Sequence, residues 1–127
     1  MNPTKNDLPG KTRERIIKLV IARLADASDL YSQSKRAYWN VKGSSFIALH
    51  ELFDDVASVV LNYVDLIAER AVQLRGSTVG TVRPASAASS LSEYPIDISD
   101  GYDHGNALTS ALASFGHLAR RALNMAA

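Results

Sequence analysis

The sequence predicts an all-α protein, an antiparallel bundle of three long helices with a short helix in a long connection. Two observations carry this prediction. Apolar residues recur every three or four positions along long stretches, as on one helix face, and no stretch shows the alternation of a half-buried strand. With 127 residues, 46% of them hydrophobic, the chain is long enough to bury a core. We therefore expect a single domain over residues 1–127.

The first helix is expected from Thr12 to about Asn40, after a flexible tail over residues 1–11 that holds two proline turns. Its apolar or small residues alternate at intervals of three and four, so they fall on one face. The helix is expected to break at Gly43. Its stripe consists of Ile17, Val20, Leu24, Ala27, Tyr31, Ser34 and Tyr38.

The second helix shows the most regular spacing in the chain. Ser44 or Ser45 is expected to cap its start, because a serine hydroxyl can accept a bond from a free backbone N–H there. Gly76, directly after Arg75, is interpreted as the glycine that ends it. Its stripe consists of Phe46, Leu49, Phe53, Val56, Val60, Val64, Ile67, Ala71 and Leu74.

Residues 77–100 are interpreted as a crossover connection, because they are rich in small residues and contain two prolines. A short helix is expected within this connection, around residues 85–91. The third long helix is expected to begin between Asp97 and Asp103 and to run to the end of the chain. Its stripe consists of Leu108, Leu112, Phe115, Ala119 and Leu123.

Composition excludes several classes of function. The formal charge is +1, so the chain is not coated in positive charge for nucleic acid or an anionic membrane. Cysteine is absent, which excludes disulfides, thiolate catalysis and zinc–thiolate sites. No secretory leader and no membrane-length apolar stretch is present, which predicts a cytoplasmic protein with no membrane partner. Five basic and two acidic residues up to Lys18 give that end a net charge of +3, typical of a solvated tail or a weak, salt-dependent DNA contact.

The second helix also carries the most unusual charge pattern. It has no Lys or Arg between Gly43 and Glu69, and the Glu-x-x-His motif of an intrachain di-iron site is absent from the chain. One interpretation is a solvated acidic face, and the other is a metal site. The residues concerned are His50, Glu51, Asp54, Asp55, Asp65 and Glu69.

Helix geometry favours a metal site shared by two chains. At ~100° per residue, four of these side chains fall within about 100° of one another, as two i,i+4 pairs that lie about 22 Å apart along the axis. An antiparallel contact between two copies of the helix, with its twofold axis near Val59 and Val60, would bring the first pair of one copy to the second pair of the other. Imidazole with carboxylates favours iron or manganese. The four residues are His50, Asp54, Asp65 and Glu69.

The segment from Lys35 to Gly76 resembles the Dps family, the mini-ferritins that protect DNA in starved bacteria. The resemblance continues more weakly through Tyr94-Pro95 and the third helix, and it implies a ferritin-like helix bundle. The residues that carry it are Tyr38-Trp39-Asn40-Val41-Lys42-Gly43, Phe46, Leu49-His50-Glu51-Leu52-Phe53-Asp54, and Asp65-x-x-Ala68-Glu69-Arg70 with Gly76.

The resemblance implies a ferroxidase site between twofold-related subunits. By position, its ligands are His50 and Asp54 of one subunit with Asp65 and Glu69 of the other. In the family, Fe(II) is oxidised there, preferentially by hydrogen peroxide, and the ferric product is stored in a hollow dodecamer. Many members also bind DNA through basic tails. The implied metal is therefore iron, the implied partners are further copies of the chain and DNA, and the implied location is the cytoplasm or the bacterial nucleoid.

The sequence departs from the family pattern in two respects. Tyr38 stands where the family has a ligand histidine, and a phenol must lose its proton to bind a metal, so Tyr38 either ligates Fe(III) as phenolate or is a packed aromatic residue. Family members also carry a fourth long helix, so we expect an apolar face of this chain to be uncovered. These departures leave an alternative function open, a non-catalytic helical protein that binds DNA or assembles with full-length relatives.

Three other side chains have two interpretations each. Trp39 is expected to anchor the core, although it could also take up oxidising equivalents. His104 and His117 are expected in surface or packing roles, with a pore-lining role as the alternative for His104.

Overall fold

The computed structural model describes residue 3 and residues 5–127, and this part of the chain forms four helices. No β-strand occurs among the described residues, where one isolated bridge joins Lys42 to Asp100. The predicted all-α class, with three long helices and a short one, is confirmed. The helices are α1 (Gly10–Asn40), α2 (Phe46–Gln73), α3 (Val82–Ala88) and α4 (Gly101–Ala126).

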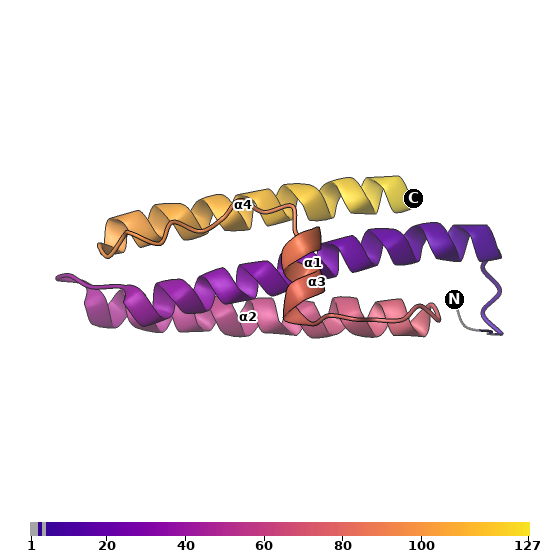
Figure 1. Cartoon of the computed structure of the whole chain (residues 1–127), viewed down its shortest axis with the longest axis horizontal. Coiled ribbons are helices and arrows are strands. Elements are labelled where there is room, and N and C mark those ends of the chain that lie inside the picture. Colours follow the sequence, from indigo (N-terminus) through magenta and orange to yellow (C-terminus); the bar gives the residue numbers. More distant parts are fainter. Residues whose placement is uncertain (1–2, 4) are drawn as a thin grey trace.

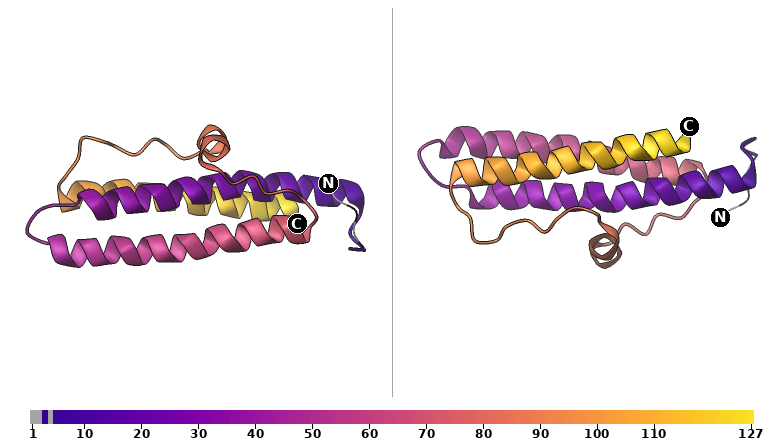
Figure 2. Two further views of the ribbon diagram at one scale, coloured as in Figure 1. Left: turned by 60° about the horizontal axis from the view of Figure 1, so that its bottom comes forward. Right: turned by 90° about the horizontal axis from the view of Figure 1, so that it is seen from above.

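The helix α1 is the element on which the other three pack. It forms an antiparallel hairpin with α2 and lies antiparallel to α4, while α2 and α4 make no extensive contact with each other (Figures 1 and 2). The connection between α2 and α4 returns along the length of the bundle and carries α3 across α1. In the described part of the chain, no helix is both long and apolar enough to cross a membrane.

The core lies where the apolar stripes of the three long helices meet around α1. Helical spacing of three and four places these residues on facing sides, so each helix buries a continuous row against its neighbour. Tyr94 of the crossover closes one side of the same cluster. The buried residues of the cluster are Leu30, Ala37, Val41, Phe53, Val60, Tyr94, Leu108 and Ala111.

The end of α2 differs from the sequence interpretation. Arg75, not Gly76, adopts the left-handed conformation, with φ of 68°. The Gly76 N–H bonds the Ala71 carbonyl at 2.9 Å and the Arg75 N–H bonds the Val72 carbonyl at 2.8 Å, the paired bonds of a Schellman motif. Gly76 is needed for a different reason: it is buried, and a Cβ there would lie 2.7 Å from Cγ2 of Ile17.

The short helix α3 begins before the predicted residues 85–91 because Pro84 belongs to its first turn. A proline is tolerated there, since the first N–H groups of a helix have no intrahelical partner. Two α1 carboxylates hold the chain that follows. Asp26, fully buried, accepts bonds from the Ser90 N–H at 2.7 Å and from Arg23 Nε at 2.7 Å, and Asp29 accepts one from the Ser89 hydroxyl at 2.7 Å.

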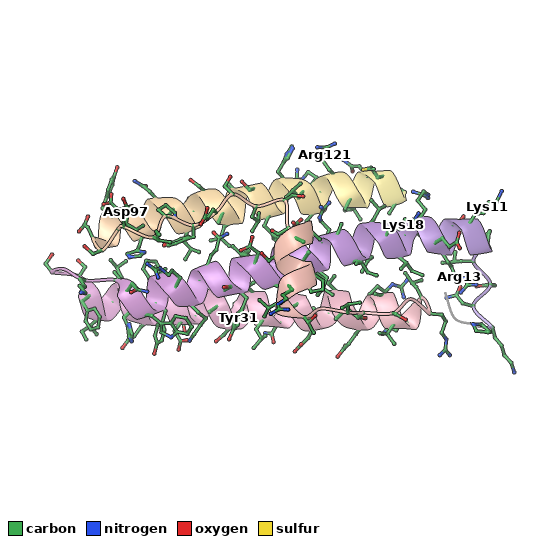
Figure 3. The ribbon with its side chains drawn as sticks, viewed as in Figure 1. Lys11, Arg13, Lys18, Tyr31, Asp97 and Arg121 are labelled. Atoms are coloured by element: carbon green, nitrogen blue, oxygen red, sulfur yellow. The ribbon has the colours of Figure 1, made fainter. Side chains whose placement is uncertain are left out.

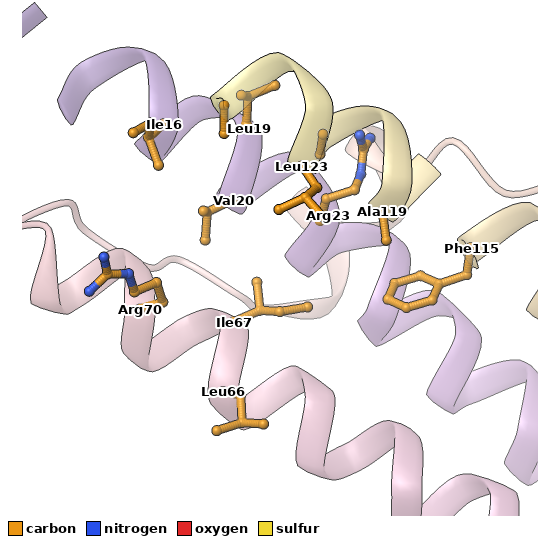
Figure 4. Close-up of a pocket in the computed structure, with 12 residues that line it drawn as sticks. Ile16, Leu19, Val20, Arg23, Leu66, Ile67, Arg70, Phe115, Ala119 and Leu123 are labelled. Atoms are coloured by element: carbon orange, nitrogen blue, oxygen red, sulfur yellow. The ribbon is translucent and has the colours of Figure 1, made fainter. Parts of the chain in front are cut away.

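The helix α4 packs on α1, and its predicted apolar stripe is only partly correct. Leu108 is buried as expected, but Leu112 and Leu123 are exposed, because α2 makes no extensive contact with α4. An apolar groove of about 350 Å³ lies there (Figure 4). Its lining is Ile16, Leu19, Val20, Arg23, Leu66, Ile67, Arg70, Phe115, Ala119, Ala122, Leu123 and Ala126.

The basic residues near the start of the chain belong mostly to a helix rather than to a solvated tail (Figure 3). Because α1 begins at Gly10, Lys11 and Lys18 are helical and exposed. Arg13 is buried and donates to the Leu74 carbonyl at 3.4 Å, and Arg15 donates to the Met125 carbonyl. Two of the five basic charges thus tie α1 to the ends of α2 and α4.

Gly76→Ala is expected to lower the free energy of unfolding by about 1–3 kcal/mol, because the added methyl meets Ile17 and the Ala71 carbonyl oxygen in a packed site. The measurement is urea unfolding followed by circular dichroism. Gly105→Ala is the matched control: no atom lies within 4 Å of its Cβ position, and alanine favours the helix by about 1 kcal/mol. Equal effects of the two substitutions would contradict the proposed close contact.

Candidate metal centre

The helix α2 positions all four candidate ligands on one face. His50 and Asp54 lie near its start and are half-buried, whereas Asp65 and Glu69 lie near its end and are exposed. Because α2 is unbroken from Phe46 to Gln73, the two pairs stay separated by the rise of the helix between them. The face they share borders the buried stripe of α2 on the side away from the apolar groove.

The orientation of His50 is fixed by the end of α1. The Val41 backbone is extended, so α1 stops, and the Lys42 N–H bonds the Ser99 carbonyl at 2.8 Å instead of continuing the helix. Tyr38 is therefore one of the terminal residues whose carbonyl lacks an intrahelical partner. That carbonyl lies 2.8 Å from Nδ1 of His50. A carbonyl can only accept, so Nδ1 donates and the Nε2 lone pair remains for a metal ion.

The ring of Tyr38 is a packing partner of His50. The two rings stack with centroids 3.9 Å apart and an interplanar angle of 23°, and the centroid of the Phe46 ring lies 5.0 Å from that of the imidazole. Tyr38 also packs against the core cluster. These contacts support the packed-aromatic interpretation of Tyr38 and hold the imidazole plane in place.

Asp54 is paired with a lysine that sequence reasoning did not single out. Lys35 Nζ lies 3.2 Å from Asp54 Oδ1, 4.0 Å from the centroid of the Tyr38 ring and 6.0 Å from that of Trp39. The Asp54 carboxylate therefore already has a cationic partner within the same chain. The sequence signal that could have identified Lys35 is its spacing. Lys35 lies one turn before Tyr38 on α1, so the two side chains share a helix face.

The other pair has no such partner. Among the described residues, no hydrogen bond or ion pair involves the carboxylates of Asp65 or Glu69. Within residue 3 and residues 5–127, no group of three or more His, Cys, Asp or Glu side chains lies close enough to hold a metal ion. One chain thus carries two separate pairs of candidate ligands, and neither pair is by itself a metal centre in the described part of the chain.

Trp39 does not anchor the core, as the sequence had suggested. Its side chain is 68% exposed, because it follows Tyr38 on α1 and so points away from the stripe that faces α2. Of the two histidines in α4, His117 is exposed, and His104 is fully buried against Tyr94. The packing role is therefore the correct interpretation of His104.

Comparison with known proteins identifies the family. A family model for the ferritin-like domain matches residues 17–127. Over 121 residues the chain is 39% identical to a DNA protection during starvation protein of Agrobacterium fabrum, spanning 95% of this chain and 75% of that protein. The chain belongs to the Dps family. A general stress protein of Bacillus subtilis, 30% identical over 80 residues, is covered over 55% of its length.

Solved Dps structures have the same fold. DpsA14 from Streptomyces coelicolor superimposes with a TM-score of 0.90 at 30% identity, over 95% of this chain and 72% of that one. The Mycobacterium smegmatis Dps gives a TM-score of 0.91 at 26% identity, over 98% and 75%. The ferritin-like fold expected from the sequence is therefore confirmed, and this Dps chain spans about three quarters of those structures.

In this Dps chain, the neutral form of the His50 imidazole is expected to carry its proton on Nδ1, because the Tyr38 carbonyl accepts it. Long-range ¹⁵N–¹H NMR correlation of the histidine side chains measures this directly. The exposed His117 is the internal control and is expected to show the Nε2–H form that free imidazole favours. A predominantly Nε2-protonated His50 would contradict the assignment of Nε2 as the ligand atom.

Proposed function

We propose that two copies of this Dps chain form a ferroxidase centre, in which His50 and Asp54 of one copy meet the Asp65 and Glu69 of the other. The single observation that most supports this proposal is the symmetry of the α2 face that carries the four candidate ligands. His50 and Glu69 lie at equal distances in sequence on either side of the peptide between Val59 and Val60, and so do Asp54 and Asp65. An antiparallel α2–α2 contact centred there pairs each residue with its counterpart.

Apolar side chains on the same face obey the same symmetry. Ile47 and Val72 lie at equal distances outside the candidate ligands, and they are 65% and 52% exposed although each is large and apolar. At ~100° per residue both fall within the arc of the ligands, as does the exposed Leu61 near the centre. A twofold contact would bury these side chains, which is the expected use of an exposed apolar stripe.

The donor set suits Fe(II) as a substrate. One neutral imidazole and three carboxylates supply nitrogen and oxygen ligands, and the negative charge favours the ferric product over the ferrous reactant. Two Fe(II) ions reduce one hydrogen peroxide molecule to two waters with uptake of two protons. By removing Fe(II) and peroxide together, the reaction prevents formation of hydroxyl radical, and this is how we propose that the chain protects DNA.

Lys35 sets a condition on metal entry. Its ammonium is 3.2 Å from Asp54, and both groups are partly solvated, so the pair contributes at most about 1 kcal/mol. A divalent ion that binds Asp54 together with Nε2 of His50 and two carboxylates of the second copy would displace the weakly bound Lys35 ammonium. Lys35 thereby neutralises Asp54 while no metal is bound and releases it when one arrives.

Asp65→Asn and Glu69→Gln together are expected to abolish saturable Fe(II) uptake and to slow peroxide-dependent oxidation by at least about tenfold, because they remove half of the donor set. The measurements are anaerobic Fe(II) titration and absorbance of the ferric product after peroxide addition. Asp55→Asn is the matched control, since Asp55 is an exposed carboxylate of the same helix outside the ligand stripe. Unchanged uptake in the double variant would disprove the proposed centre.

Mixing variants then tests whether the centre is shared. A His50→Ala, Asp54→Ala chain and an Asp65→Ala, Glu69→Ala chain each lack one half-site in every centre. If the chains re-associate at random, about a quarter of all centres in an equimolar mixture become complete, and oxidation returns to about that level. No recovery after verified exchange of subunits would contradict a site made between copies.

Tyr38→His is expected to raise Fe(II) affinity by about tenfold, because a neutral imidazole binds Fe(II) without first losing a proton and a phenol does not. Isothermal titration under anaerobic conditions measures the change. Tyr38→Phe, which keeps the stacked ring on His50, is the control and should leave the affinity near that of the native chain. A lower affinity in Tyr38→His would contradict the interpretation of this position.

A further inference from the structure

The apolar groove between α2 and α4 runs along the second half of α4 (Figure 4). Both helices pack on α1, which forms the floor of the groove, but they make no extensive contact with each other. A stacked pair of rings, Tyr63 of α2 and Phe115 of α4, joins the two walls at one end, with centroids 6.4 Å apart. From Phe115 to Ala126 the α4 wall extends for about 16 Å, or three helical turns.

The groove exposes apolar side chains that belong to regular helices. Leu66 of α2 is 63% exposed and Leu123 of α4 is 71% exposed, although both are large and apolar. Val20 of α1 and Ile67 of α2 also line the groove and are only half-buried. Single exposed apolar residues need no partner, but a contiguous set from three helices is typical of a binding surface.

The chemistry of the walls favours a helix as the occupant. The only polar side chains in the lining are two arginines, so an extended peptide would lie against apolar walls with unpaired backbone N–H and C=O groups. A helix satisfies those groups internally. The α4 wall also presents Ala119, Ala122 and Ala126 at intervals of three and four. Such small side chains let the ridges of a second helix approach closely.

The charges of the groove indicate an acidic partner. Its two charged lining residues, Arg23 and Arg70, are both positive. Arg23 is paired with Asp26 at 2.7 Å, whereas Arg70 is exposed and donates to the neutral amide oxygen of Gln73 at 3.3 Å. The sequence of α4 has no acidic residue after Asp103. Two copies of the chain placed groove to groove would bring like charges together, so a second copy does not fit this surface.

We propose that the groove binds an amphipathic α-helix of another protein, about three turns long, with an apolar side that enters the groove and carboxylates at the edge that meets Arg70. The groove lies on the flank of α2 away from the candidate ligands, so the helix and a second copy can bind the same chain together. This interaction does not rest on the proposed iron chemistry.

The probe is a synthetic peptide of two heptads, with leucine at the two core positions of each heptad and glutamate at the flanking positions. Titration into the full chain is followed by calorimetry and by circular dichroism, because a helix this short is only marginally formed in water and gains helicity when it binds. Saturable binding of one peptide per chain is expected. Absence of binding, or binding without a gain in helicity, would overturn the proposal.

A second peptide with lysine in place of every glutamate tests the charge argument. It is expected to bind about fivefold more weakly, because exposed ion pairs contribute at most about 1 kcal/mol, and the difference should shrink in high salt. Arg70→Gln should weaken binding of the glutamate peptide and reduce the preference between the two peptides. Equal affinities of the two peptides for the native chain would contradict the acidic partner.

Variants of the chain test the location. Leu66→Gln and Leu123→Gln alter opposite walls and are each expected to weaken binding of the glutamate peptide by about tenfold, because each removes a leucine that the helix would bury. The matched controls are Ile47→Gln and Met125→Gln, exposed apolar residues of the same two helices outside the groove lining. All four side chains are exposed, so the fold should persist, which circular dichroism checks. Equal losses in test and control variants would overturn the site.

Other occupants give different results. If the groove joins two copies of the chain, sedimentation shows an association that Leu66→Gln and Leu123→Gln abolish and that the peptide does not compete with, and the proposal is overturned. If the groove is a site for a small amphiphile, dodecanoate binds with the same dependence on Leu123 while neither peptide does, which also overturns it. Failure of Fe(II) uptake would disprove the ferroxidase centre and leave the peptide result standing.

Discussion

The end of α1 is the constraint on which the rest of the site depends. Because the chain becomes extended at Val41, the Tyr38 carbonyl is left for His50, and the Lys42 N–H turns to the Ser99 carbonyl ahead of α4. One helix terminus therefore orients a candidate ligand on α2 and fixes the start of the helix that carries His104. If α1 continued for another turn, the Tyr38 carbonyl and the Lys42 N–H would bond within the helix, and neither contact could form.

Sequence periodicity located the helices and the candidate ligand face because both depend on geometry within one helix. The positions of His50, Asp54, Asp65 and Glu69 around α2 follow from ~100° per residue and needed no tertiary information. Periodicity cannot say which neighbour covers a face, and the errors arose there. Leu123 lies on a face of α4 that nothing among the described residues covers, Trp39 lies just outside the stripe of α1, and Lys35 reaches Asp54 from another helix. The sharing of the ligand face between copies stays a prediction.

The helix α2 has more apolar surface than α1 can cover. The uncovered surface lies on two flanks, one on each side of the buried row. One flank carries the ligand face, with the exposed Ile47 and Val72 at its ends, and the other carries Leu66 at the wall of the apolar groove. A single helix packed on one neighbour buries about one third of its circumference, which matches the row through Phe53 and Val60. The two flanks are therefore suited to different neighbours. Only the flank that carries the candidate ligands has the twofold symmetry needed to pack against a second copy of the chain.

Splitting the centre between copies would couple iron chemistry to assembly. In a lone chain, Asp65 and Glu69 are solvated carboxylates and Asp54 is held by Lys35, so an iron ion there would keep most of its water. Fe(II) bound so loosely still reacts with peroxide and releases hydroxyl radical into solvent. In the proposed shared centre, the full donor set would hold the metal beside His50 and the Tyr38 ring stacked on it, and iron oxidation would then depend on the contact between copies.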